Sequence, residues 1–394
     1  MKALKQLDII QKILLAEESE NYTTHQQLLE EVRRLQRAVE TPIDTMKRIT
    51  MQMVQNIVVR IAIEKRWLQI VASANGTPVR PLEIAAETKD DPTFITRILR
   101  FLAVIGLCDE NVQGKYTANE RTLFFVQSGS IAAVKATYDL FFPMAGRLVD
   151  YMQGPGLPAA TGKLEESLSR FTYGTNHVFD MMETKPELKK SFDEYMFAEQ
   201  QWFPFAWFEI YPPAEKLGNS EFEPSHPLIV DIAGGHGQNL IHFKEHYPNH
   251  SGRLILQDLP STIEGTPRLP DGIEAMGHDC FTPQPVQGAS IYMFRHIIHD
   301  WSDSEAEHIF RQIVPAMDPE QSTLLIVDRV MPEHEPELRD VELDLLMWLA
   351  VNGLERTESQ WSKLFQKAGL KLTRVWRSPR LGDCVLEAKI ALHG

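Results

Sequence analysis

The sequence has few cysteines and no excess of positive charge, and each shortage excludes a class of protein. Cys108, Cys280 and Cys384 lie far apart, and no two of them form a Cys-x-x-Cys pair. We therefore expect neither a disulfide framework nor a zinc site, and this usage fits a reducing compartment. The formal net charge of −14 argues against general nucleic-acid binding, which needs a basic surface.

Long hydrophobic runs are also absent. No uninterrupted apolar stretch reaches the length that spans a bilayer. The first residues are interrupted by Lys2, Lys5, Asp8 and Lys12, and they do not form the apolar core of a signal peptide. These absences predict a soluble, cytoplasmic protein without a membrane partner. A chain of 394 residues can bury a full core and is long enough for two domains.

Residues 1 to about 60 have the periodicity of helices. Their apolar residues fall on two stripes, which are Leu4, Leu7, Ile10 and Leu14, and then Leu28, Val32, Leu35 and Val39. Neither stripe has a partner nearby in the sequence. Each stripe therefore packs either inside the same chain or against a second subunit.

Residues 61–125 predict three helices and a hairpin, the arrangement of a winged helix. Helices are expected near Trp67, from Pro81 to Thr88 and after Pro92. Such modules often bind DNA. The stretch from Arg80 to Arg121, however, contains six Lys or Arg and seven Asp or Glu. We expect a structural or subunit-pairing role for it.

Residues 126–222 are helical and rich in aromatic side chains, with a cluster from Trp202 to Phe208. Such clusters usually form plain core, although a flat apolar substrate would need the same kind of wall. Both interpretations stay open at this point.

From residue 223 onward, strand and helix patterns alternate. Strands are expected at 228–231, 253–257, 289–294 and 323–328, followed by a hairpin of 370–377 and 384–390. We predict an α/β fold in which a Rossmann-like domain (126–394) has a parallel sheet and an antiparallel C-terminal hairpin. A helical and winged-helix domain (1–125) precedes it.

A glycine-rich turn follows the first of these strands. Gly234, Gly235 and Gly237 separate an apolar run from a helical pattern. Glycine lets a ligand lie against the backbone, and the amides at the following helix start face that ligand. Asp258 comes 21 residues past Gly237, where an acid of a nucleotide-binding unit holds ribose hydroxyls. The turn indicates a nucleoside-type cofactor, and a purely structural glycine turn is the alternative.

A second group of candidate functional residues begins at the end of the strand at 289–294. His299 lies at the carboxyl end of that strand, where open α/β sheets bind ligands, and a histidine can accept a proton near neutral pH. Arg295 is four residues earlier, so a short helix would place both on one face. Asp328 and Glu355 supply acids at other strand ends, and a carboxylate on one ring nitrogen makes the other a better base. A histidine with a structural role is the alternative.

Together these segments resemble class I S-adenosylmethionine-dependent O-methyltransferases of the caffeic-acid type and their fungal secondary-metabolism relatives. The similarity covers most of the chain. It rests on Asp231-Ile-Ala-Gly-Gly-His-Gly237, Gln257-Asp258-Leu259-Pro260, Gly277-His278-Asp279-Cys280-Phe281, His299-Asp300-Trp301 and Glu355-Arg356-Thr357. The resemblance implies a homodimer paired through the N-terminal region. It also implies S-adenosylmethionine as cofactor and a small phenolic or enolic substrate of the polyketide or alkaloid type.

The resemblance also assigns residues. Those implied to bind the cofactor are Gly234, Gly235 and Gly237 at its methionyl part, Asp258 at the ribose, Asp279 and Cys280 at the adenine, and Arg295 where plant enzymes carry a lysine. His299 would be the general base, flanked by Asp328 and Glu355. Asp328 stands for a glutamate and is one methylene shorter. Ala233 replaces the first glycine of the family, which is acceptable where φ is negative.

The implied chemistry needs no metal, because His299 would remove the hydroxyl proton as the oxygen attacks an electrophilic methyl group. No cluster of oxygen ligands in the sequence argues for a metal. Two rivals remain. Some relatives with this fold keep the cofactor but catalyse dehydration or pericyclic ring closure, and a non-catalytic or DNA-binding regulator could be built on the winged helix.

Overall fold

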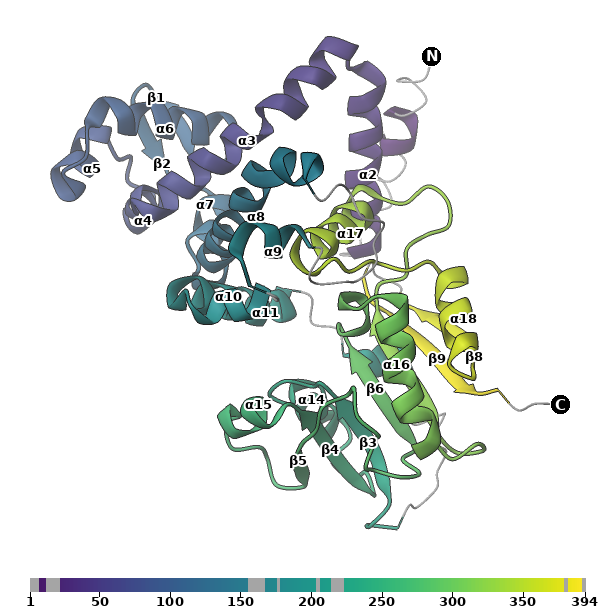
Figure 1. Ribbon diagram of the computed structural model, residues 1–394. Coiled ribbons are helices and arrows are strands. Elements are labelled where there is room, and N and C mark those ends of the chain that lie inside the picture. Colours follow the sequence, from purple (N-terminus) through teal and green to yellow (C-terminus); the bar gives the residue numbers. More distant parts are fainter. Residues whose placement is uncertain are drawn as a thin grey trace. The chain divides into compact units, whose positions relative to one another are not determined.

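The computed structural model describes residues 7–11, 22–154, 167–175, 178–202, 206–213, 223–378 and 382–391, and the chain divides into two units (Figure 1). The first unit comprises Met1–Leu14, Glu31–Leu148 and Phe179–Pro204. The second comprises Leu15–Glu30, Val149–Val178 and Phe205–Gly394. The predicted boundary between functional domains at residue 125 stays a prediction.

The described residues of the first unit form helices and one hairpin (Figure 1). The elements that lie wholly or mainly in this unit are α3 (Pro42–Glu64), α4 (Trp67–Ser73), α5 (Pro81–Thr88), α6 (Pro92–Val104), β1 (Asp109–Val112), β2 (Lys115–Thr117), α7 (Glu120–Phe125), α8 (Ser128–Gln153), α10 (Val178–Glu183) and α11 (Pro186–Trp202). The three predicted helices and the hairpin are confirmed as elements. Asp91 starts α6 because its side chain accepts a hydrogen bond from Phe94 N at 2.7 Å and Pro92 occupies the first turn.

The predicted N-terminal stripes fall partly within the structure. Leu7 and Ile10 lie in a helical segment (7–11), whereas Leu4 and Leu14 lie outside the described residues. The second stripe lies on α2 (Tyr22–Val39), where Val32 and Val39 are largely exposed. No helix within the described ranges is both long and apolar enough to cross a membrane.

The second unit contains a seven-stranded sheet in the order β5-β4-β3-β6-β7-β9-β8. Its strands are β3 (Pro227–Ile232), β4 (Arg253–Asp258), β5 (Ile273–Gly277), β6 (Ile291–Arg295), β7 (Thr323–Asp328), β8 (Leu370–Arg377) and β9 (Cys384–Ile390). The first five are parallel, and β9 runs antiparallel to both β7 and β8. The predicted parallel sheet and closing hairpin are confirmed. Strand β5 was not predicted, because Ile273 is its one buried residue and an edge strand of this kind lacks an apolar pattern.

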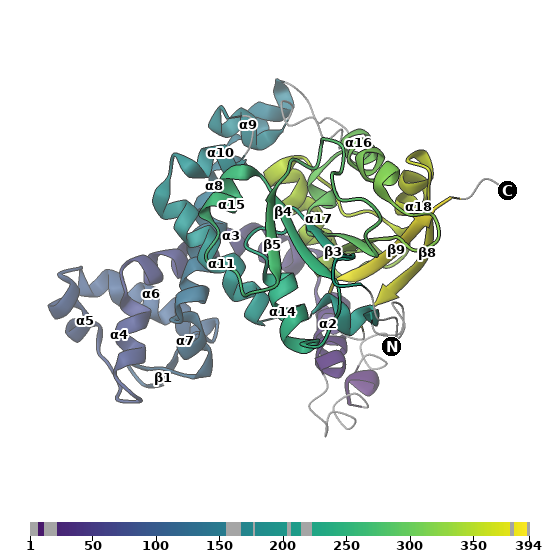
Figure 2. The same cartoon turned by 90° about the horizontal axis from the view of Figure 1, so that it is seen from below.

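Alternating side chains of the strands form two cores, one on each face of the sheet. Tyr292 and Phe294 pack with α16 (Asp303–Ile313) and α18 (Glu358–Lys367). On the opposite face, Met293 packs with α12 (Trp207–Ile210) and α14 (Gln238–His246). Figure 2 shows the sheet between α14 and the pair of α16 and α18.

The remaining described elements of this unit are α9 (Leu168–Tyr173), α15 (Pro260–Gly265), η2 (Ile298–Asp300), η3 (Val314–Ala316) and α17 (Leu338–Val351). Trp207 and Phe208 belong to the core under the sheet, which supports the plain-core interpretation for these two aromatics. Phe203 and Phe205 lie outside the described residues.

The sheet order places a switch point between β3 and β6. The chain runs from β3 outward to β4 and β5, and then returns to continue on the other side with β6 and β7. Ligands of open α/β sheets bind in the crevice at the carboxyl ends of the strands beside such a switch. The glycine turn after β3 and the segment after β6 both lie at that edge.

Candidate active site

The turn after β3 has a backbone that few residues other than glycine adopt. Gly235 and Gly237 have φ of 59° and 81°, and Ala233 has φ of 56°. The expectation that Ala233 keeps a negative φ is therefore wrong. Its left-handed conformation costs about 1–2 kcal/mol, and the turn holds it because Gly234 N donates to Gln257 O at 3.1 Å in β4. A Cβ at Gly234 would lie 2.6 Å from Asp231 Oδ2, so this position requires glycine.

Asp258 is fixed beside this turn at the end of β4. Its Oδ2 accepts from Gly235 N and its Oδ1 accepts from Leu259 N, both at 2.8 Å. Each oxygen retains a second acceptor site. The space around Gly235 is open, since a Cβ there would meet no atom within 4 Å. The predicted glycines and Asp258 are therefore brought together, and the space is open at Gly235.

Asp279 and Cys280 follow β5 and lie next to the end of β4. The link is His278 N, which donates to Asp258 O at 2.8 Å. Asp279 Oδ1 accepts from Phe281 N at 3.0 Å, which orders the loop. Burial raises the pKa of Cys280 to about 12, so this thiol stays protonated and is unsuited to be a nucleophile.

Arg295 ends β6 and belongs to a buried polar network. Its guanidinium donates to Asn239 Oδ1 at 2.9 Å and lies 3.4 Å from Asp383 Oδ2. Asn239 in turn donates to Asp231 Oδ2 at 3.3 Å. Burial raises the pKa of Asp231 to about 7, although Asn239 and Arg295 oppose the shift. The network therefore joins the end of β3 to the end of β6.

Arg295 and His299 do not share a helical face, and that prediction is wrong. Arg295 is still in the strand, and His296 has a left-handed φ of 56°. The single 3₁₀ turn η2 begins only at Ile298. The interruption at His296 separates the two side chains, so Arg295 contacts Asn239 whereas His299 contacts carboxylates.

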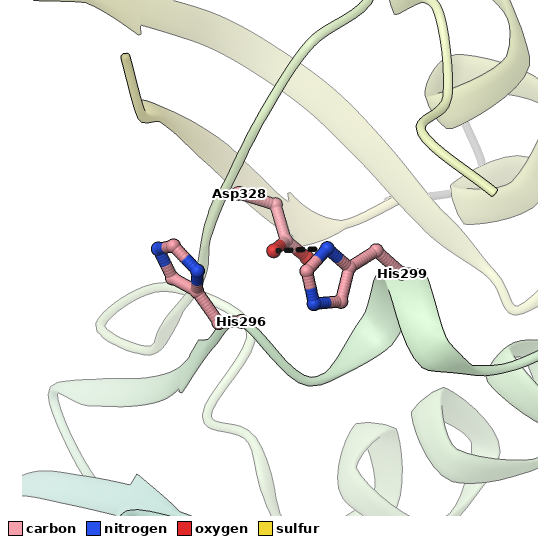
Figure 3. Close-up of side chains that lie close together, drawn as sticks. All are labelled: His296, His299 and Asp328. Carbon is pink, nitrogen blue, oxygen red and sulfur yellow. Dashed lines mark ion pairs between the residues drawn. The ribbon is translucent and has the colours of Figure 1, made fainter. Parts of the chain in front are cut away.

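His299 lies among three acids (Figure 3 shows it with Asp328). Its Nδ1 is 2.9 Å from Glu355 Oε1 and 3.7 Å from Asp328 Oδ1, and its Nε2 is 3.6 Å from Asp300 Oδ1. Glu355 is thus within hydrogen-bond distance, whereas the shorter Asp328 is not. Burial lowers the pKa of His299, but the charge of Asp328, the hydrogen bond with Glu355 and the charge of Asp300 outweigh it and raise this pKa well above its usual value.

Backbone contacts place Glu355 against His299. Leu354 N donates to His299 O at 3.0 Å, and Glu355 N donates to Asp344 Oδ1 at 2.8 Å. A Cβ at Gly353 would collide with the carbonyl oxygen of His299. The absence of a side chain at Gly353 therefore permits the close approach that sets the histidine–glutamate distance.

Arg356 holds the same segment through its guanidinium, and no pattern in the sequence indicated this role. Its guanidinium donates to Ile298 O at 3.0 Å, to Trp301 O at 2.7 Å and to Asp303 Oδ1 at 2.9 Å. The side chain is fully buried over the ring of Trp361. The planar fork thus satisfies two carbonyls that flank His299 and fixes the turn that carries it.

Comparison with known proteins gives consistent matches. A family model described as an O-methyltransferase domain matches residues 160–371. Demethylsterigmatocystin 6-O-methyltransferase of Aspergillus flavus is 32% identical over 361 residues, covering 91% of this chain and 92% of that protein. The structure of LepI in complex with SAM has a TM-score of 0.86 at 28% identity and covers 99% of this chain and 100% of its own. A structure described as a pericyclic reaction enzyme has a TM-score of 0.85 at 28% identity, with 97% of each chain covered.

The three hydrogen bonds of the Arg356 guanidinium predict a large loss of stability for Arg356→Met. In this variant Trp301 O loses the hydrogen bond from Arg356, and Ile298 O keeps a longer one from Trp301 N at 3.3 Å. Each lost bond to a buried carbonyl costs about 1–3 kcal/mol, so the free energy of unfolding should fall by about 2–5 kcal/mol. Arg377→Gln is the control, because Arg377 and Glu358 form an ion pair in which both side chains are about half exposed, and such pairs contribute about 0–1 kcal/mol. Equilibrium urea unfolding gives the free energy of unfolding of both variants. Equal losses of that free energy would contradict the stabilising role of Arg356.

Proposed function

This chain belongs to the O-methyltransferase family, and we propose that it transfers a methyl group from S-adenosylmethionine to a phenolic or enolic hydroxyl of a small secondary metabolite. The observation that carries the proposal is the pairing of His299 Nδ1 with Glu355 Oε1 at 2.9 Å. This pairing lies at the same edge of the sheet as the glycine turn and Asp258. A proton acceptor and a nucleoside site are the two parts that such a reaction needs.

The residues at the end of β3 and β4 fit this cofactor. Asp258 offers both carboxylate oxygens to two neighbouring hydroxyls, and Gly235 leaves its backbone open to a ligand. Asp231 is fully buried, and its Oδ1 has no hydrogen-bond partner within the described part of the chain. A site with two acids suits a ligand that carries hydroxyls and a positive charge. Gly234, Gly237, Asp279, Cys280 and Arg295 complete the proposed set.

S-adenosylmethionine supplies an electrophilic methyl group. The acceptor hydroxyl, with a pKa of about 10 for a tyrosine-like phenol, is mostly protonated at neutral pH and is a poor nucleophile in that form. His299 Nδ1–H donates a hydrogen bond to Glu355, which fixes the tautomer and leaves Nε2 free to take the proton of the acceptor hydroxyl. His299 is the catalytic base, Glu355 orients it, and Asp328 stabilises the imidazolium through its charge.

The acids around His299 have two opposing consequences. They favour the protonated ring, as the raised pKa of His299 indicates, whereas a base must be neutral before it accepts a proton. Like charges in one buried site oppose each other. Binding of a positively charged cofactor therefore favours the neutral ring, and the same acids then stabilise the proton that His299 takes from the acceptor.

The class of acceptor is supported by the relatives. Demethylsterigmatocystin 6-O-methyltransferase of Aspergillus flavus, at 32% identity, is named for methyl transfer to an oxygen of demethylsterigmatocystin. A polyketide-type or alkaloid-type hydroxyl is the corresponding acceptor for this chain. The winged-helix assignment, the boundary at residue 125 and a cytoplasmic location stay predictions.

A pericyclic or dehydrating activity that retains the cofactor is the second candidate. It is favoured by the likeness to a pericyclic reaction enzyme at 28% identity. The two activities differ in their products, because methyl transfer adds one methyl group and leaves S-adenosylhomocysteine. A ring closure leaves the mass of the substrate unchanged, and a dehydration lowers it by one water.

His299→Gln should slow methyl transfer by roughly 10²–10⁴, the usual contribution of one general base, while binding of S-adenosylhomocysteine stays near wild type. The loss should shrink as the pH approaches the pKa of the acceptor hydroxyl, because that hydroxyl then ionises without help. Mass spectrometry of one reaction mixture quantifies methylated product and S-adenosylhomocysteine, with phenolic and enolic metabolites as acceptors. His308→Gln, an exposed position on α16, is the control.

Two outcomes would contradict the proposal that His299 is the base of a methyl transfer. If a substrate is consumed and neither methylated product nor S-adenosylhomocysteine appears, the second candidate replaces methyl transfer. If His299→Gln transfers methyl groups as fast as His308→Gln, His299 is not the base.

We also propose that the chain pairs as a homodimer through its N-terminal helices. Met46, Ile49 and Met53 lie on one stripe of α3 and are 55%, 59% and 58% exposed in the single chain. Exposed apolar stripes of this kind mark interaction surfaces. A second copy of the chain is the partner that the family resemblance implies.

Light scattering at micromolar concentration tests this pairing. The full chain should have the mass of a dimer, and the triple variant Met46→Glu, Ile49→Glu, Met53→Glu should become monomeric because the charges would be buried at the interface. Gln52→Glu with Gln55→Glu, at exposed polar positions on the same helix, is the control and should stay dimeric. A monomeric full chain would refute the proposal.

A further inference from the structure

Two histidines and one aspartate converge at the carboxyl ends of β6 and β7 (Figure 3). One ring nitrogen of His296, one of His299 and one carboxylate oxygen of Asp328 all lie within 4.8 Å of one another. The backbone produces this convergence. His296 N donates to Val327 O at 3.1 Å, which places His296 beside Asp328, and the left-handed φ of His296 turns the chain there.

Asp328 has acceptor capacity that the described protein groups leave unused. It is fully buried, and neither of its oxygens has a hydrogen-bond partner among the residues that the structure describes. His299 Nδ1, at 3.7 Å, is beyond hydrogen-bond distance. A buried carboxylate without a donor is costly. A cation between Asp328 and the two imidazoles would remove that cost.

Each histidine is also held by a second carboxylate. His296 Nε2 is 2.8 Å from Asp383 Oδ2, and His299 Nδ1 is 2.9 Å from Glu355 Oε1. Metal-binding histidines commonly use their other ring nitrogen in this way, because the carboxylate orients the ring and raises its basicity. The cluster therefore has the supporting contacts of a metal site as well as three ligand groups.

We propose that His296, His299 and Asp328 bind one borderline divalent transition-metal ion, of which Zn²⁺ is the representative, and that the bound ion inhibits methyl transfer by occupying His299. Two imidazoles and one carboxylate suit zinc, whereas magnesium and calcium prefer oxygen ligands. The scarcity of cysteine argues against a cysteine-rich zinc site and leaves a histidine site open. Zinc binding does not depend on the proposed function, whereas the inhibition of methyl transfer rests on that function.

The site closes around the ion by a small movement. Ligand atoms of four-coordinate zinc lie roughly 3.3 Å apart, given bond lengths of about 2.0–2.2 Å. The separations within the cluster, which reach at most 4.8 Å, must therefore shorten by up to about 1.5 Å. The His296 side chain is 47% exposed and has room to rotate. Asp328 is fixed in the sheet, and a water molecule takes the fourth position.

Zinc binding is measured first, without substrate, by competition of the full chain with a chromophoric chelator. The wild-type chain should bind one Zn²⁺ and should not respond to Mg²⁺. His296→Asn should weaken binding by more than about tenfold, since even the loss of a carboxylate behind a ligand costs about 10–100-fold. Asparagine is chosen because it tolerates the left-handed φ of this position. His308→Asn is the control for exposed histidines and should bind zinc like the wild type.

The second measurement is methyl transfer with and without Zn²⁺, each variant being compared with its own zinc-free rate. Wild type and His308→Asn should be inhibited and recover on chelation, and His296→Asn should resist at the same zinc concentration. Equal zinc affinity of wild type and His296→Asn, or no binding at all, would overturn the site. Stoichiometric binding with undiminished turnover would place the ion away from His299 and would also overturn the proposal. Binding without any detectable methyl transfer in zinc-free buffer would instead count against the proposed function.

Discussion

The hydrogen bond between His299 Nδ1 and Glu355 Oε1 joins two segments that are 56 residues apart in the sequence. It orients the imidazole, and everything proposed for the reaction depends on that orientation. The bond itself depends on the backbone around it. Gly353 permits the close approach, Leu354 N binds His299 O, and Arg356 holds the carbonyls on either side of the histidine. The residues around the pair therefore act mainly by fixing the distance between His299 Nδ1 and Glu355 Oε1.

Acidic side chains form two groups along the carboxyl edge of the sheet, and Arg295 lies between the two groups. Asp231 and Asp258 lie at or near the ends of β3 and β4. Asp328 at the end of β7 and Glu355 in the segment after α17 lie on the same nitrogen of His299. Arg295 extends from β6 to Asn239 and Asp383. Burial raises the pKa of Asp383, but the charges of His296 and Arg295 outweigh it and hold this pKa below its usual range. A positively charged cofactor and a proton-accepting histidine both benefit from such an acidic edge.

The elements with strong local signals could be predicted from the sequence. Strand β3 before the glycine turn, helix α14 after it, Asp258 and the C-terminal hairpin are where apolar runs and glycines predict them. The failures have physical reasons. Ala233 adopts a conformation that alanine ordinarily avoids, and the left-handed His296 ends the pattern that seemed to join Arg295 to His299. Arg356 could not be recognised, because burial of an arginine depends on carbonyls that only the fold brings to it.

The central claim is that Glu355 acts through His299, and a double-mutant cycle of methyl transfer rates tests it most directly. Glu355→Gln, His299→Gln and the double variant are compared with the wild type at one pH and saturating cofactor. Residues that act as one unit are strongly non-additive. The account predicts that Glu355→Gln slows the wild type substantially but slows His299→Gln by no more than about twofold, which is within the roughly 0.3–0.5 kcal/mol scatter of additive free energies. A double variant whose loss equals the product of the two single losses would show that Glu355 acts independently of His299 and would contradict the account.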